Sequence, residues 1–173
     1  MKRTLLLLAF ALIVPAVAPA APPTAQAEFD AGLTAYRRGD YQQALADFWP
    51  LAAQGYALAE YNLGLMYANG QGVTQDYAKA LKWYRLAVAQ GDAPAENNLG
   101  SMYYKGQGVP QNYVTAYKWY LIAKATIPAT NRHYALVSQN VKSLAALMTP
   151  AQIAEAQQEA SAWYAAHEHS GKS

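Results

Sequence analysis

Apolar residues recur along this chain at intervals of three and four positions, which predicts a succession of amphipathic helices. One such segment places its apolar side chains at Tyr77, Ala80, Tyr84 and Ala87. Asp76 stands directly before it, where a side chain that caps a helix N-terminus belongs, and Gly91 follows it, where a left-handed residue ends many helices. No segment alternates apolar and polar residues over a useful strand length, so we predict an all-α fold.

The helical pattern repeats along the chain. Residues 40–75 and 76–111 align without a gap at a period of 36, and 20 of those 36 positions are identical. A third copy opens at Asn112, and its Trp119-Tyr120 pair repeats Trp83-Tyr84 of the second copy. A period of this size, with two helices per unit, predicts an α-solenoid in which each unit buries its apolar face against the next. Gly64 and Gly100 occupy the same helical phase, which predicts a close approach by a neighbouring helix.

The two ends of the chain depart from the repeat. A short helix ending at Gly39-Asp40 is expected first, followed by a helix that begins at Tyr41. After Pro128, residues 134–148 carry a single apolar stripe, and Thr149-Pro150 is a strong helix start. We predict that these last two helices form a C-terminal capping pair. Trp83 and Trp119 are expected to fill the interior of the stack.

The repeated units resemble the Sel-one-like repeat, a relative of the tetratricopeptide repeat. The motif Ala-x-Ala-x-x-Asn-Leu-Gly-x-Met-Tyr-x-x-Gly-x-Gly-Val stands at 57–73 and at 93–109, and Asp-Tyr-x-x-Ala-x-x-Trp-Tyr-x-x-Ala stands at 76–87. The resemblance covers roughly residues 28–126. It implies a right-handed superhelix of antiparallel helix pairs that serves as a protein-interaction adaptor. The family has no shared catalytic residues, so the resemblance transfers none.

The N-terminus has the pattern of a secretory signal. Lys2 and Arg3 precede the apolar run 5–14, and Ala25-Gln26-Ala27 fits a cleavage site, which predicts a signal peptide over residues 1–27. The apolar run is too short to span a bilayer, so stable membrane insertion after cleavage is not expected. The predicted organisation is then a repeat domain at 28–166 and a disordered tail at 167–173, in a periplasmic or secreted protein.

Composition narrows the range of partners. The chain has 13 Lys and Arg residues and 11 Asp and Glu residues, so removal of Lys2 and Arg3 leaves 11 of each sign. A neutral domain gives no electrostatic reason to expect nucleic acid as a partner. The chain has no cysteine, so its stability must come from packing.

The candidates for chemistry are weak. Asn62 and Asn98 are interpreted as amides that bond neighbouring backbone, and Gly70-Gln71-Gly72 as a turn, because it follows a helix and lacks phosphate-loop spacing. The His167-Glu168-His169 run lacks the spacing of a helical metal site, and His133 stands alone. We therefore expect no cofactor, no metal and no enzymatic activity.

A binding surface is the better-motivated hypothesis. In tetratricopeptide-like stacks the first helix of each unit lines a concave groove, and its outward positions here are Tyr61, Leu65, Asn69, Asn97, Ser101, Tyr104 and Lys105. We predict that they bind a protein or peptide partner in the bacterial cell envelope. An envelope enzyme, or a protein that binds cell-wall fragments or β-lactams, is the alternative, since the 14 tyrosines could stack on sugars. Homotypic assembly is a third hypothesis, but the predicted cap argues for a monomer.

Overall fold

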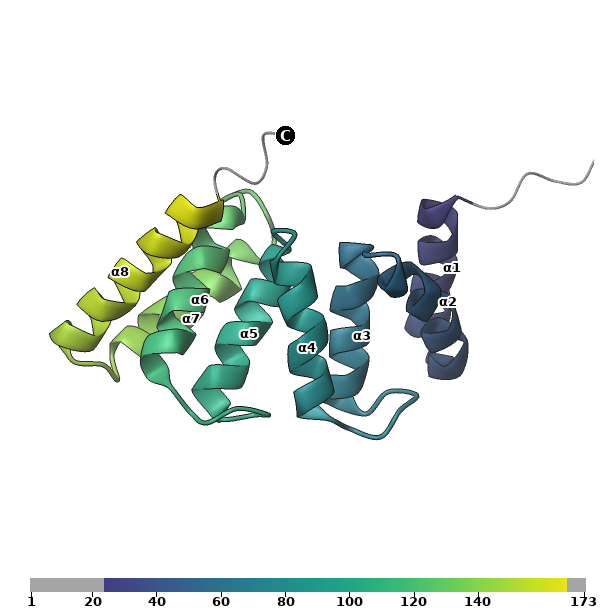
Figure 1. Ribbon diagram of the computed structural model, residues 1–173, viewed down its shortest axis with the longest axis horizontal. Helices are drawn as coiled ribbons and strands as arrows, with labels where there is room; N and C mark the ends of the chain where they lie inside the picture. Colours follow the sequence, from purple (N-terminus) through teal and green to yellow (C-terminus); the bar gives the residue numbers. More distant parts are fainter. Residues whose placement is uncertain (1–23, 168–173) are drawn as a thin grey trace, which may run out of the picture.

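The protein is a row of helices. The computed structural model describes residues 24–167, and within them it contains eight α-helices and no strand (Figure 1). These are α1 (Ala25–Arg38), α2 (Tyr41–Ala53), α3 (Ala57–Asn69), α4 (Tyr77–Val88), α5 (Ala93–Lys105), α6 (Tyr113–Thr126), α7 (Tyr134–Ala145) and α8 (Pro150–His167). Residues 1–23 and 168–173, which hold most of the predicted signal peptide and tail, lie outside the described residues.

Successive helices pack as neighbours and follow one another across the molecule (Figure 1). The most extensive contacts lie within the pairs α1–α2, α3–α4 and α5–α6, and each pair then contacts the next through α2–α3 and α4–α5. The predicted all-α solenoid is confirmed. At its C-terminal end, α7 and α8 each pack mainly against α6 rather than against each other.

The helix boundaries follow the capping chemistry of the sequence. Asp76 Oδ1 accepts a hydrogen bond from Lys79 N at 2.9 Å, and Asn112 Oδ1 accepts one from Thr115 N at 2.9 Å, one period later. Asp92 caps α5 in the same manner. Thr149 and Gln152 bond each other's backbone at the start of α8, which is a capping box. The helix starts predicted at Asp76, Asn112 and Thr149 are confirmed, and the cap at Asp92 is a finding of the structure.

One glycine in each unit lets the paired helices approach closely. A Cβ added at Gly64 would lie 2.5 Å from the Tyr84 ring of α4, a distance that real side chains do not adopt. Gly100 has the same relation to Tyr120 of α6, at 2.7 Å. The predicted close approach is thus confirmed, and the close neighbour is an aromatic ring of the paired helix. A Cβ added at Gly32 of α1 would likewise lie 2.7 Å from the ring of Phe48 in α2, so the first pair is built on the same plan.

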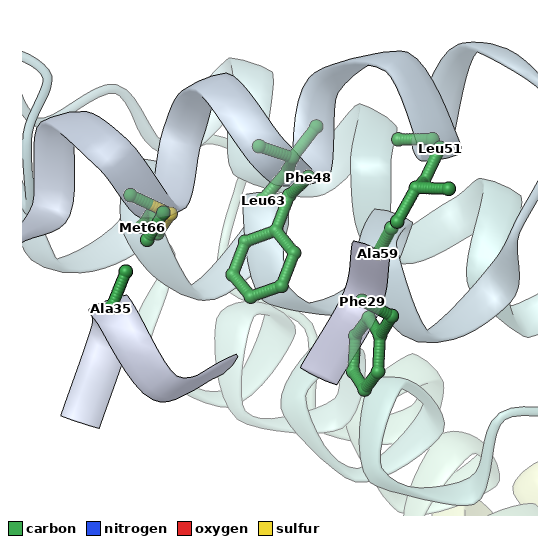
Figure 2. Packing of buried hydrophobic residues seen from close by; sticks show 9 residues of the cluster. Phe29, Ala35, Phe48, Leu51, Ala59, Leu63 and Met66 are labelled. Atoms are coloured by element: carbon green, nitrogen blue, oxygen red, sulfur yellow. The ribbon is translucent and has the colours of Figure 1, made fainter. Parts of the chain in front are cut away.

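The core of the first units shows how these pairs stack. Phe29 and Ala35 of α1, Phe48 and Leu51 of α2, and Ala59, Leu63 and Met66 of α3 are buried together (Figure 2). The rings of Phe29 and Phe48 lie 5.5 Å apart. Three consecutive helices thus bury one continuous apolar layer, which is the repeating principle of a solenoid.

The Gly-Gln-Gly loops fasten each unit to the preceding one. Gln71 Nε2 donates to Tyr41 Oη at 3.1 Å, and Gln107 Nε2 donates to Tyr77 Oη at 2.9 Å. Gly72 has a φ of +71°, and a Cβ there would lie 2.8 Å from the carbonyl oxygen of Tyr41. The loop therefore needs glycine for both its conformation and its contact, and the interpretation of this motif as a turn agrees with the structure.

The prediction for the tryptophans needs correction. Trp83 and Trp119 are half-buried, whereas the adjacent Tyr84 and Tyr120 are buried. The tyrosines lie on the stripe that faces the paired helix. The ring of Trp83 instead meets that of Trp49, which is 47% exposed, at 5.5 Å.

Within residues 24–167, no helix combines the length and apolarity needed to cross a bilayer.

Candidate functional site

A hollow of about 150 Å³ lies between α3 and α5, the first helices of two successive units. Its lining is supplied by α3, α4, α5 and the loop after α5, and comprises Leu65, Ala68, Asn69, Tyr77, Tyr84, Asn98, Ser101, Met102 and Gln107. The hollow exists because α3 and α5 are held apart by the intervening α4. Tyr84 of that helix forms part of the lining.

A second, smaller hollow of about 70 Å³ occupies the equivalent place between α5 and α7. It is lined by Tyr104, Tyr120, Asn140, Ser143 and Leu144. Neither lining includes an Asp, Glu, Lys, Arg or His side chain. Any group bound in either hollow therefore meets apolar surface and uncharged hydrogen-bonding groups.

Exposed leucines flank these hollows. Leu58 of α3 is 42% exposed, and its spacing of seven places it on the same helical face as Leu65. Leu136 of α7 is 54% exposed, and spacings of four and seven place it on the face of Asn140 and Ser143. The face formed by α3, α5 and α7 thus combines uncharged polar groups with apolar side chains accessible to a partner.

Four of the predicted surface residues line the hollows. Leu65, Asn69 and Ser101 contribute to the hollow between α3 and α5, and Tyr104 contributes to the hollow between α5 and α7. Lys105 is exposed as the last residue of α5. The larger hollow therefore combines residues of two successive units, and the smaller one combines residues of the α5–α6 unit with residues of α7.

The other two predicted residues are engaged within the protein. Asn97 Oδ1 accepts a hydrogen bond from Asn140 Nδ2 at 2.8 Å, which ties α5 to α7. Tyr61 is half-buried, with its ring 6.1 Å from that of Tyr84, and burial raises the pKa of its phenol. Both side chains support the shape of the surface.

Several lining residues were not predicted from the sequence. Asn140 and Ser143 belong to α7, which lies outside the repeat, so alignment of the copies could not indicate them. Tyr77 was predicted only as part of an apolar helix face, and Gln107 is the counterpart, one period later, of Gln71 in the predicted turn. Asn98 was interpreted as a packing amide, but it lines the larger hollow, while its counterpart Asn62 donates to Leu58 O within its own helix.

Buried carboxyl groups lie near the start of α3 and α5, outside both hollow linings. Glu60 is 3% exposed and accepts a hydrogen bond from Gln90 Nε2 at 2.7 Å. Glu96, its counterpart one period later, is fully buried, and neither carboxylate oxygen has a hydrogen-bond partner in the described structure. Burial raises the pKa of Glu96 to about 7, and nearby Asp92 adds to this effect.

The histidines at positions 133 and 167, which the structure describes, lie far apart in the sequence and on different helical segments. His133 stands at the start of α7, and His167 is the last residue of α8, with its ring stacked on Trp163 at 4.1 Å. His169 lies outside the described residues. Between residues 24 and 167, no three His, Asp or Glu side chains are grouped as metal ligands would be.

Comparison with known proteins assigns the repeats. The family model of the Sel1 repeat matches residues 57–92 and 93–125, which correspond to α3–α4 and α5–α6. The chain carries two Sel1 repeats. The resemblance drawn from the repeated motifs is thereby confirmed. No curated protein matches the chain.

Solved structures of Sel1-type proteins share this arrangement. A protective antigen of uropathogenic Escherichia coli strains, which displays an SLR fold, is similar over 83% of this chain and 30% of its own, with 28% identity and a TM-score of 0.74. A Sel1 repeat protein from Oxalobacter formigenes is similar over 67% of this chain and 45% of its own, with 32% identity and a TM-score of 0.60. The chain therefore spans less than half the length of either protein.

Proposed function

We propose that this Sel1-repeat chain is an adaptor that binds a protein or peptide partner on the face formed by α3, α5 and α7. Sel1 repeat proteins generally mediate protein–protein interaction. The observation that carries the proposal is the pair of uncharged hollows between successive first helices, flanked by exposed leucines.

The physical character of this face suits a peptide. Amide and hydroxyl groups of Asn69, Asn98 and Ser101 offer hydrogen bonds to main-chain groups, while Leu65 offers apolar contact. Tyrosines such as Tyr104 provide large contact area at low cost in side-chain entropy. Since the hollow linings are uncharged, we expect the affinity to depend only weakly on salt.

The proposed location is the cell envelope. It rests on the basic residues Lys2 and Arg3, the apolar run at 5–14 and the Ala25-Gln26-Ala27 motif, which together fit a Sec-type signal peptide. Mass spectrometry of the chain recovered from a periplasmic extract tests this, because a mature N-terminus at Glu28 is expected. A chain recovered only from the cytoplasm, with Met1 retained, would contradict it.

Site-directed cross-linking tests the binding face. The chain has no cysteine, so one cysteine can be introduced at Ser101 and labelled with a photoreactive maleimide. Trp49→Cys on α2 is the control, because Trp49 is exposed outside the α3–α5–α7 face. We expect the Ser101 probe to capture a discrete envelope protein that the Trp49 probe does not, and mass spectrometry would identify it.

Binding of the purified partner then separates the faces quantitatively. Leu136→Glu on α7 should weaken binding at least tenfold, whereas Leu86→Glu on α4 should leave it unchanged. The two leucines are similarly exposed, at 54% and 48%. Equal effects of the two substitutions would refute the assignment of the face.

Light scattering of the free chain at two concentrations tests the proposed monomer.

A further inference from the structure

The three glycine–aromatic contacts place α1, α3 and α5 in a common register. Four residues after the contacting glycine, the same helical face carries Tyr36, Ala68 and Tyr104, respectively. A large ring in the first and third helices is thus replaced by a methyl group in the middle one. Ala68 lines the hollow between α3 and α5.

In the first unit, Tyr36 fills the place that corresponds to this hollow. Its ring lies 5.5 Å from the ring of Tyr41, the first residue of α2. Its hydroxyl donates a hydrogen bond to Gln71 Oε1 at 2.9 Å, while Gln71 Nε2 donates to Tyr41 Oη. The phenol is therefore held by an aromatic ring on one side and an amide oxygen at its tip.

The third unit repeats the ring pairing. Tyr104 stacks on Tyr113, the first residue of α6, with ring centroids 5.7 Å apart and an interplanar angle of 28°. A tyrosine on the first helix of a unit thus pairs with the tyrosine that opens the second helix, in the units on both sides of the middle one.

The middle unit has the counterparts of the tyrosine and glutamine that surround Tyr36, but it has Ala68 in place of the phenol itself. Tyr77 opens α4 as Tyr41 opens α2, yet it has no aromatic ring paired with it among residues 24–167. Gln107 Nε2 donates to Tyr77 Oη at 2.9 Å, as Gln71 does to Tyr41. Gln107 Oε1 corresponds to Gln71 Oε1, which accepts the hydrogen bond of the Tyr36 hydroxyl. Among residues 24–167, no donor forms a hydrogen bond with Gln107 Oε1.

We propose that the hollow between α3 and α5 binds a tyrosine side chain of the partner protein, with its ring beside Tyr77 and its hydroxyl donating to Gln107 Oε1. This inference rests on the proposed adaptor function and specifies its ligand. The volume of about 150 Å³ suits a six-membered ring, since an engineered cavity of ~150 Å³ binds benzene. The chain's own Tyr36 shows how such a ring fits into surroundings of this type.

The hydroxyl should contribute specificity. A neutral hydrogen bond of this kind corresponds to a preference of roughly 2- to 12-fold. We therefore expect p-cresol, which reproduces the tyrosine side chain, to bind more tightly than toluene by that factor. Titration of each compound into the isotope-labelled chain, followed by NMR signals of the Ala68 methyl and the Gln107 side-chain amide, measures both affinities.

Two substitutions make the test specific to this hollow. Ala68→Tyr should fill it from within, remove p-cresol binding and leave the chain at least as stable as the parent. Ala68→Met fills the same space without a hydroxyl and should also remove binding, which keeps the test informative if the tyrosine variant folds poorly. Binding of p-cresol that persists in both variants would overturn the proposal, as would equal affinities for p-cresol and toluene.

Tyr36→Ala is the matched gain-of-site variant. Removal of this phenol should create an equivalent hollow beside Tyr41 and Gln71, so the variant should bind a second p-cresol and regain thermal stability when p-cresol is added. Failure to bind more p-cresol than the parent chain would mean that the described surroundings do not recognise a phenol.

The partner identified by cross-linking separates this proposal from the adaptor function. We expect Ala68→Tyr to weaken partner binding at least tenfold, as Leu136→Glu should. If Leu136→Glu weakens binding and Ala68→Tyr does not, the adaptor function stands and the tyrosine proposal fails. A concentration-dependent rise in mass of the free chain that Ala68→Tyr abolishes would assign the hollow to a second copy and likewise refute a partner tyrosine.

Discussion

Glu96 provides the sharpest test of the packing at the C-terminal end of the solenoid. Its repeat counterpart Glu60 is satisfied by Gln90, and the residue one period after Gln90 is Thr126. Thr126 donates its hydroxyl to Ile122 O at 3.1 Å, and both oxygens of the buried Glu96 carboxyl are left without a hydrogen bond in the described structure. We predict that Glu96→Gln stabilises the protein at neutral and alkaline pH.

The magnitude follows from the pKa of Glu96, which burial raises from 4.5 to about 7 in the folded protein. A difference of about 2.5 between the folded and unfolded pKa corresponds to about 3 kcal/mol at 1.36 kcal/mol per pKa unit. Because the folded-state pKa is the higher one, the stability associated with the protonated carboxyl is fully present below about pH 4.5. It is lost as the pH rises through about 7, and the cost of ionising the buried group is then complete.

The assay is urea denaturation of the parent chain and the Glu96→Gln variant between pH 4 and pH 9. The difference in unfolding free energy should be small at pH 4 and should favour the variant by about 2–4 kcal/mol at pH 9. Glu60→Gln is the control and should show a weaker pH dependence, because Gln90 donates to the Glu60 carboxylate. Thr126→Gln should reduce the effect by supplying the missing donor. A difference between parent and Glu96→Gln that does not vary with pH would show that Glu96 is solvated or paired.

Three further predictions concern the core and the loops. Gly64→Ala should destabilise by about 1–3 kcal/mol in thermal unfolding, because its Cβ would meet the Tyr84 ring; an ordinary helix-interior substitution of this kind gains ~1 kcal/mol instead, and such a gain would contradict the close contact. Tyr84→Ala should cost about 3–5 kcal/mol, and Trp83→Ala, at a half-buried ring, roughly half as much; equal losses in urea denaturation would place Trp83 in the core. Gln71→Ala should cost about 1–2 kcal/mol through loss of its bonds to Tyr36 and Tyr41, and unchanged stability would mean that these bonds do not persist in solution.

Local patterns sufficed for most of the helices because their determinants lie close together in the sequence. Asp76 and Asn112 cap helices through backbone groups three residues away. The prediction for Trp83 failed for the opposite reason. Trp83 and Tyr84 are adjacent and both aromatic, and which of them is buried depends on the angle at which α4 meets α3 and α5.

The sequence by itself determined the period, the helix pairs and the positions where glycine must stand, since each is recorded in neighbouring residues or in identical copies 36 apart. Only the tertiary structure decided which faces remain open. The hollow at Ala68 depends on the separation of α3 and α5 and on the loop that carries Gln107 to Tyr77. The unpaired carboxyl of Glu96 likewise depends on a residue thirty positions away. Such contacts join residues of different helices that are far apart in the sequence, so their outcome follows from how the helices pack.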